Sequence, residues 1–91
     1  MRPLYFDHNA TTPVAARVFA AMRPYFEDRF GNPGSAHIWG LRAKQAVDGA
    51  RAAVAGLIGA SPGEIVFTGC ATEANNAVLF GHFPDRAGHL A

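Results

Sequence analysis

The chain has 91 residues, enough for one small domain, and its hydrophobic share of 49% excludes an intrinsically disordered composition. Eight Lys and Arg residues against seven Asp and Glu residues give a formal net charge of +1, which argues against a nucleic-acid-binding surface. No apolar run approaches the roughly 20 residues of a membrane span, and the N-terminus lacks the pattern of a secretory signal.

The first third of the chain is predicted to hold a short extended segment, a helix and a loop. Residues 4–6 are β-prone. A helix should begin at Thr12-Pro13, because Thr can cap a helix and Pro is favoured in the first turn. Pro24 should kink or end this helix, with at most a final turn beyond it. Gly, Asn, Pro and Ser crowd residues 30–37, which predicts an irregular loop.

The rest of the chain is predicted to alternate helix, strand and helix. Apolar side chains recur at helical spacing over residues 38–58, and Gly59 is a natural stop for that helix. Residues 61–63 should turn the chain into a short buried strand, residues 64–67. A further helix should begin near Ala71 and end around residue 81.

Helices that alternate with short apolar strands indicate an α/β fold. The sequence offers only two or three strand candidates, whereas a complete parallel sheet needs more. No internal repeat or low-complexity linker divides the chain. We therefore expect the first part of a larger α/β fold.

The stretch FTGCATEANN, residues 67–76, places small and polar residues where a strand should give way to a helix. A helix N-terminus carries unpaired N–H groups and a partial positive charge, so it attracts anions. Gly69 and Ala71 leave the backbone accessible, and the Thr72 hydroxyl adds a donor. Residues 69–72 are thus a candidate phosphate or carboxylate site, with an ordinary strand-to-helix turn as the alternative.

Several segments of the chain resemble one enzyme family. FTGCATEANN resembles the TSGATESNN or TSCATES segment of the cysteine desulfurases, which are pyridoxal-phosphate (PLP) enzymes of the class-V aminotransferase group. LYFDHNATTPV is similar to the family's YLDNNATTPV, and FGNPGSAHIWG to its FGNPSSxHxxG. ARAAVAGLIGASPGEIVFT follows its AR-x-x-VA-x-LIGA-x-x-x-EIVFT. The motifs keep the family's order across essentially the whole chain, which is most similar to the NifS/IscS-like branch.

The resemblance implies PLP-dependent transferase fold type I, the aspartate-aminotransferase-like α/β fold, incomplete in this chain. Residues 1–13 would contribute to the small domain and the substrate cleft. Residues 14–91 would begin the large PLP-binding domain. In the family's usual order the Schiff-base lysine and the reactive cysteine lie beyond residue 91, so no catalytic residue is expected here.

The resemblance also assigns binding roles residue by residue. Ala71 and Thr72 match the pair that binds the phosphate of PLP. Asn9, Ala10 and Thr11 match the segment that the family places near the substrate cleft. The resemblance implies no metal site.

Two further residues invite a chemical role that the resemblance does not support. Lys44 is the only lysine, but it matches no family motif and lies four residues before Asp48, as a surface ion pair would. Cys70 is the only cysteine, and the family's sulfur-accepting cysteine lies much later in the chain. We expect Cys70 to be a small packing residue beside the phosphate turn.

The full-length protein is expected to convert L-cysteine to L-alanine. Its sulfur would pass as an enzyme persulfide to a scaffold or carrier protein, for iron–sulfur cluster or other sulfur-cofactor assembly. It should be a cytoplasmic homodimer with no nucleic-acid or membrane partner, and this chain alone should be inactive. Two alternatives remain: another class-V PLP enzyme, such as a selenocysteine lyase or an aminotransferase, or a small non-enzymatic α/β protein that binds an anion or a partner.

Overall fold

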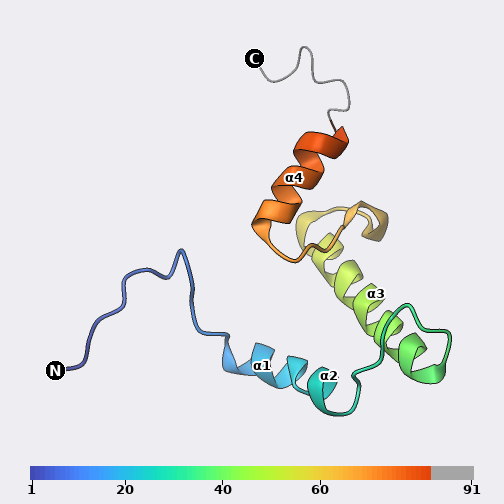
Figure 1. The fold of residues 1–91 in the computed structure, drawn as a ribbon, viewed down its shortest axis with the longest axis horizontal. Helices are drawn as coiled ribbons and strands as arrows, with labels where there is room; N and C mark the ends of the chain where they lie inside the picture. The colour runs from blue at the N-terminus through green and yellow to red at the C-terminus, as the bar shows by residue number, and fades with distance from the viewer. Residues whose placement is uncertain (83–91) are drawn as a thin grey trace. The chain divides into compact units, whose positions relative to one another are not determined.

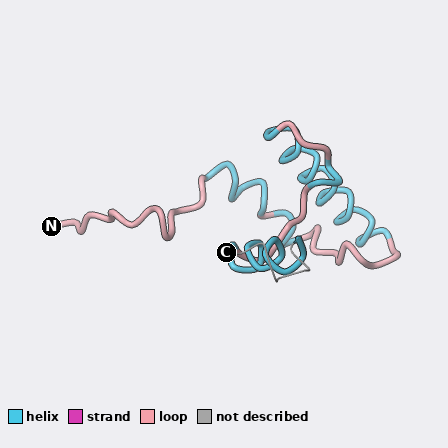
Figure 2. The backbone as a smooth tube through the Cα atoms, turned by 90° about the horizontal axis from the view of Figure 1, so that it is seen from above, coloured by secondary structure: helices cyan, strands magenta, loops and turns pink. Residues whose placement is uncertain are grey.

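A computed structural model describes residues 1–82, which form helices joined by loops (Figure 1). The chain divides into two compact units, residues 1–50 and the residues from 51 onward. The elements are α1 (Ala16–Met22), α2 (Pro24–Glu27), α3 (Ile38–Ile58), the 3-10 helix η1 (Pro62–Glu64) and α4 (Ala71–His82). The backbone drawn by secondary structure shows helix and loop alone among these residues (Figure 2).

The first helix begins later than the sequence predicts. Its N-cap is Ala15, which has no capping side chain, and the predicted start at Thr12-Pro13 is therefore wrong. The Thr12 hydroxyl instead lies 3.0 Å from Nδ1 of His8. This local hydrogen bond holds Thr12 in the preceding turn, so its side chain is engaged before the helix starts.

The predicted effect of Pro24 is confirmed. Arg23 closes α1 with an N–H bond to the carbonyl of Phe19, and Pro24 opens the single turn of α2. Because proline has no N–H, the helical ladder cannot continue through it, but proline is tolerated in the first turn of the next helix.

The bounds predicted for α3 are confirmed, as is its stop at Gly59. Gly59 has φ of +70°, a left-handed conformation that glycine adopts at little cost, and the N–H of Ala60 then reaches back to the carbonyl of Ala55. Ala43 and Ala55 are the buried hydrophobic residues among residues 1–82.

The loop before α3 is held by its own polar groups, as its composition predicts. The side-chain oxygen of Asn32 accepts the N–H of Gly34 at 2.9 Å. Nδ1 of His37 accepts the N–H of Gly40 at 3.2 Å, so His37 satisfies a donor in the first turn of α3. A Cβ on Gly40 would overlap the carbonyl oxygen of Ser35, and the loop can therefore close against α3 only with glycine there.

The two predicted strands are not found among the described residues, so the expected α/β alternation is not observed in them. Glu64 ends η1 instead of opening a buried strand, and Ile65 is extended (φ −99°, ψ 123°). Val66 is 78% exposed, and residues 4–6 are also exposed and irregular. An extended segment becomes a strand only when a neighbour completes its ladder of hydrogen bonds, and residues 1–82 supply no such neighbour.

Large apolar side chains remain exposed along the helices. They include Val14, Val18, Phe19, Met22, Tyr25 and Phe26 around α1 and α2, Ile38, Trp39, Leu41, Val54, Leu57 and Ile58 on α3, and Val78, Leu79 and Phe80 on α4. No helix within residues 1–82 is long and apolar enough to cross a membrane. These helices therefore present apolar faces that this part of the chain does not cover.

Candidate phosphate-binding junction

The segment that leads into α4 is fixed to α3 by one arginine. Nη1 of Arg51 donates a hydrogen bond to the carbonyl oxygen of Ile65 at 2.5 Å. Its guanidinium also lies over the ring of Phe67, 5.0 Å from the ring centroid. Arg51 is half-buried, so both contacts are partly shielded from water. This pair of contacts sets the path of residues 65–67 toward the junction.

The turn between this segment and α4 is closed by side chains at both ends. The Thr68 hydroxyl donates to the carbonyl of Cys70 at 3.1 Å. The N–H of Gly69 donates to the carboxylate of Glu73 at 2.8 Å. An acidic side chain in the first turn also interacts favourably with the positive end of the helix.

Glu73 is a residue that the motif analysis missed. An acidic residue in the first turn, reaching back to an N–H before the helix, is a known N-terminal signal and could have been read from the sequence. Its contact means that the N–H of Gly69 is already engaged. A Cβ on Gly69 would lie 3.2 Å from the Glu73 carboxylate, so the glycine leaves room for this contact.

The donors of Ala71 and Thr72 remain available at the start of α4. The first hydrogen bond of the helix runs from the N–H of Ala74 to the carbonyl of Cys70 at 3.2 Å, so the N–H groups of Ala71 and Thr72 precede the helical ladder. Both residues are exposed. Two backbone donors, a hydroxyl and small side chains fit the phosphate of a cofactor.

The side chain of Cys70 is not packed as the sequence analysis predicts. It is an exposed free thiol. The structural contribution of Cys70 comes from its carbonyl, which accepts both the Thr68 hydroxyl and the N–H of Ala74. Among residues 1–82 the thiol has no hydrogen-bond partner.

The N-terminal turn brings one of the three predicted cleft residues to a hollow. The carbonyl of Asp7 accepts the N–H groups of Ala10 and Thr11, at 3.0 and 3.2 Å. Thr11 then lines a cavity of about 480 Å³ with Tyr5, His8, Thr12 and Pro13. Asn9 and Ala10 lie in the exposed turn and do not line it.

Tyr5 organises this turn, which the sequence did not indicate. Its hydroxyl lies 2.6 Å from the Thr11 hydroxyl and 3.0 Å from the carbonyls of Asp7 and Thr11. The ring of His8 meets the Tyr5 ring edge to face at 4.8 Å. His8 therefore has a structural partner on each side, Tyr5 and Thr12.

The prediction that Lys44 forms a surface ion pair is confirmed. Its ammonium lies 2.6 Å from the carboxylate of Asp48, four residues along α3, and both side chains are more than half exposed. An exposed pair of this kind contributes at most about 1 kcal/mol.

Comparison with known proteins identifies the family. The model of the aminotransferase class-V family matches residues 4–87, and the chain belongs to that family. Over 80 residues it is 51% identical to "Cysteine desulfurase IscS" of Rickettsia typhi and 52% identical to that of Rickettsia massiliae. It is 51% identical over 79 residues to "Cysteine desulfurase 2" of Trichormus variabilis.

These alignments cover 87% of this chain but 20% of each relative, so the chain spans about a fifth of their length. A solved structure named "NIFS-like protein" superposes with a TM-score of 0.83 at 44% identity. The match covers 91% of this chain and 24% of that one. The described part of the chain is therefore similar in fold to the corresponding part of that structure. The resemblance to cysteine desulfurases is confirmed.

Proposed function

We propose that this chain is the N-terminal portion of a cysteine desulfurase, which converts L-cysteine to L-alanine. The observation that carries the proposal is the identity of 51–52% to proteins of that name over 87% of the chain. The family is PLP-dependent, and the junction residues that match its phosphate-binding pair present suitable donors. The complete protein would have the α/β fold type I. Its remaining residues would supply the strands that residues 1–82 lack.

In this proposal the N–H groups of Ala71 and Thr72 and the Thr72 hydroxyl hold the phosphate of PLP. A hydrogen bond to a charged group contributes about 1.5–3 kcal/mol, and the helix N-terminus adds about 1 kcal/mol at most. When bound, PLP supplies the electron sink for reactions at the amino-acid substrate. Ala71 and Thr72 would bind and orient the cofactor without taking part in the bond changes.

The N-terminal turn would lie at the substrate cleft. We assign residues 1–13 to the small domain and residues 14–91 to the start of the large domain. Thr11 supports this assignment because it lines a hollow, whereas Asn9 and Ala10 would contribute their turn rather than a direct contact.

The groups that perform the chemistry would lie outside this chain. Lys44 is paired with Asp48 on a helix surface, so it does not have the setting of a Schiff-base lysine. The reactive cysteine would also lie beyond residue 91. It would carry the sulfur as a persulfide to a scaffold or carrier protein, for assembly of iron–sulfur clusters or another sulfur cofactor.

The exposed apolar faces of α1, α2 and α4 support this proposal, because a stable domain would cover them. We infer that the rest of the fold packs on them, in a cytoplasmic homodimer. The chain alone should then be loosely packed or aggregated, as well as inactive.

The direct test is to incubate the full-length protein with PLP, L-cysteine and a thiol reductant, and to measure alanine and sulfide. Equal amounts of both products, at a rate well above background, are expected. Residues 1–91 alone should stay at background. A protein that released selenium from L-selenocysteine but left L-cysteine intact would be a selenocysteine lyase. One that, when a 2-oxo acid is added as amino-group acceptor, converted L-cysteine to its keto acid without sulfide would be an aminotransferase. Either result would contradict the proposal.

A further inference from the structure

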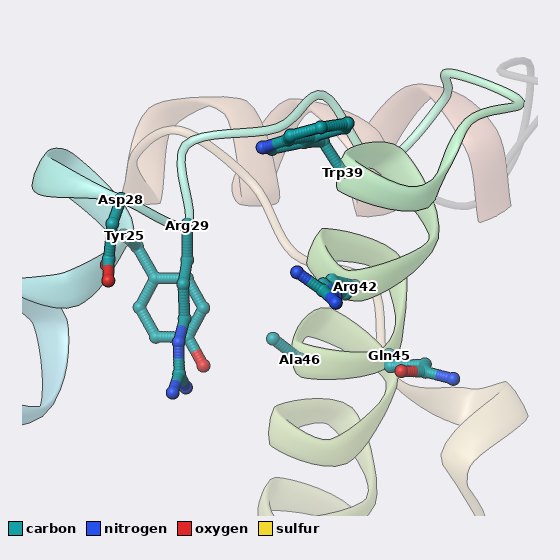
Figure 3. A pocket seen from close by; sticks show the side chains of 7 residues that line it. All are labelled: Tyr25, Asp28, Arg29, Trp39, Arg42, Gln45 and Ala46. Carbon is teal, nitrogen blue, oxygen red and sulfur yellow. The ribbon is translucent and has the colours of Figure 1, made fainter.

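A pocket of about 640 Å³ lies within residues 1–50, between the end of α2 and the first half of α3 (Figure 3). Its volume is within the range of roughly 300–1,000 Å³ that is typical of small-molecule sites. Polar and aromatic side chains line most of it: Tyr25, Asp28, Arg29, Trp39, Arg42 and Gln45. It shares no residue with the Ala71-Thr72 junction.

Two cations reach this space from different elements. In Figure 3 the side chain of Arg29 comes from the segment after α2 and that of Arg42 from α3, and both residues line the pocket. The ion pairs among residues 1–82 use Arg23 and Lys44 instead. Arg29 and Arg42 therefore have no ion-pair partner in the described part of the chain.

The pocket is consequently short of negative charge. Asp28 is the acidic residue in its lining, and no ion pair in the described part of the chain engages its carboxylate. Two guanidinium groups against one carboxylate leave an excess positive charge. A guanidinium is a planar fork of N–H donors that matches the geometry of a carboxylate or a phosphate.

Aromatic surface lies beside these cations. Trp39 is 52% exposed, so its ring can accept a ligand. Trp39 can pack against a planar or apolar group, while the Gln45 amide supplies a further donor. The overall charge of +1 and the limited volume of the pocket favour a small ligand over a nucleic acid.

We propose that this pocket binds a small organic anion. Arg29 and Arg42 hold its carboxylate or phosphate group, and its planar body packs on Trp39. This site goes beyond the proposed desulfurase activity and does not depend on it.

The test is calorimetric titration of the full-length protein that has been loaded with PLP and then dialysed free of excess PLP. The α4 junction is then occupied, and no free PLP, itself a planar phosphate, competes with the probes. Phenyl phosphate and benzoate serve as the two probes, so that their relative affinities show which anionic group the site prefers. Inorganic phosphate, which has no ring, should bind more weakly than phenyl phosphate. The double replacement R29Q/R42Q should lower the affinity for the tighter-binding probe by about tenfold or more.

Two matched variants separate the pocket from general charge effects. R17Q/K44Q removes the same charge outside the pocket and should leave probe affinity unchanged. R42K keeps the positive charge but loses the planar set of guanidinium donors. It should therefore lower the affinity less than R29Q/R42Q does. Both pocket arginines are exposed, and a melting temperature close to wild type would show that the variants are folded.

Three results would overturn the proposal. The first is no binding of either aromatic probe at millimolar concentration. The second is an equal loss of affinity in R17Q/K44Q and R29Q/R42Q. The third is probe binding that is lost in T72V and kept in R29Q/R42Q, because the anion would then occupy the α4 junction.

Discussion

Arg51 and Ile65 are joined by a hydrogen bond of 2.5 Å from the guanidinium to the carbonyl oxygen, across fourteen positions of sequence. The same guanidinium lies over the ring of Phe67. One side chain on α3 therefore fixes an otherwise exposed segment that leads directly to the start of α4. The start of α4 carries the proposed phosphate donors. In the proposed site, Arg51 would therefore position these donors without contacting the phosphate itself.

Replacing Arg51 by Met should loosen residues 65–68. The change removes a charged hydrogen bond, about 1.5–3 kcal/mol, and a cation–π contact of about 0.5–1 kcal/mol, while keeping an apolar stem. In the full-length protein, backbone amide exchange over residues 65–68 should become at least about tenfold faster. R17M removes an exposed arginine elsewhere and should leave this exchange unchanged. Unaltered exchange in R51M would show that the contact does not hold the segment.

Two glycines of α3 should respond in opposite directions to alanine. A Cβ at Gly40 meets the carbonyl oxygen of Ser35, whereas a Cβ at Gly49 meets nothing within 4 Å. G40A should therefore lower the free energy of unfolding by about 2 kcal/mol or more, because backbone must move. G49A should raise it by about 0.5–1 kcal/mol through helix propensity. Denaturant titration of the full-length protein measures both, and equal effects would contradict the packing described for the loop before α3.

Glu64 should titrate below the usual range of a glutamate. The N–H of Ser61 donates to its carboxylate at 2.8 Å and the Ser61 hydroxyl lies at 3.1 Å, and these hydrogen bonds lower its pKa from the ordinary 4.5. Because the folded pKa is the lower one, the contact stabilises η1 above the unfolded pKa. This stabilisation is lost as the pH falls through the folded pKa.

An NMR titration of the Glu64 carboxyl tests this assignment. S61A removes the hydroxyl but keeps the backbone donor, so the pKa should rise part of the way toward 4.5. A Glu64 pKa that is ordinary in the native protein and unmoved by S61A would show that these hydrogen bonds do not persist in solution.

Helix α3 and the break between α1 and α2 were predictable because their signals are local. Periodic apolar residues and Gly59 specify α3, and Pro24 alone accounts for the break between α1 and α2. The strands could not be predicted in the same way, because a strand depends on a neighbouring strand that can be distant in sequence. Ile65 has the backbone angles of a strand, but residues 1–82 hold no neighbouring strand for it to pair with.

The sequence indicates the residues that could donate hydrogen bonds to a phosphate. It gives less indication of the contacts that hold those residues in place. Small residues before a helix are visible in the sequence, so Ala71 and Thr72 could be selected. The contacts of Arg51 and Tyr5 depend on tertiary geometry, which no local pattern reveals. Glu73 could have been found from its place in the first turn of α4.

The central claim is that Ala71 and Thr72 hold the phosphate of PLP, and it is tested most directly by measuring PLP affinity. Apo full-length protein, T72V and C70A would be titrated with PLP, with bound cofactor quantified by equilibrium dialysis. T72V keeps the shape but removes the hydroxyl, and should weaken binding by about 1.5–3 kcal/mol, or roughly ten- to a hundredfold in Kd. C70A removes an exposed thiol but no backbone donor, and should bind PLP as the wild type does. Normal PLP affinity in T72V, together with a large loss in C70A, would contradict the account.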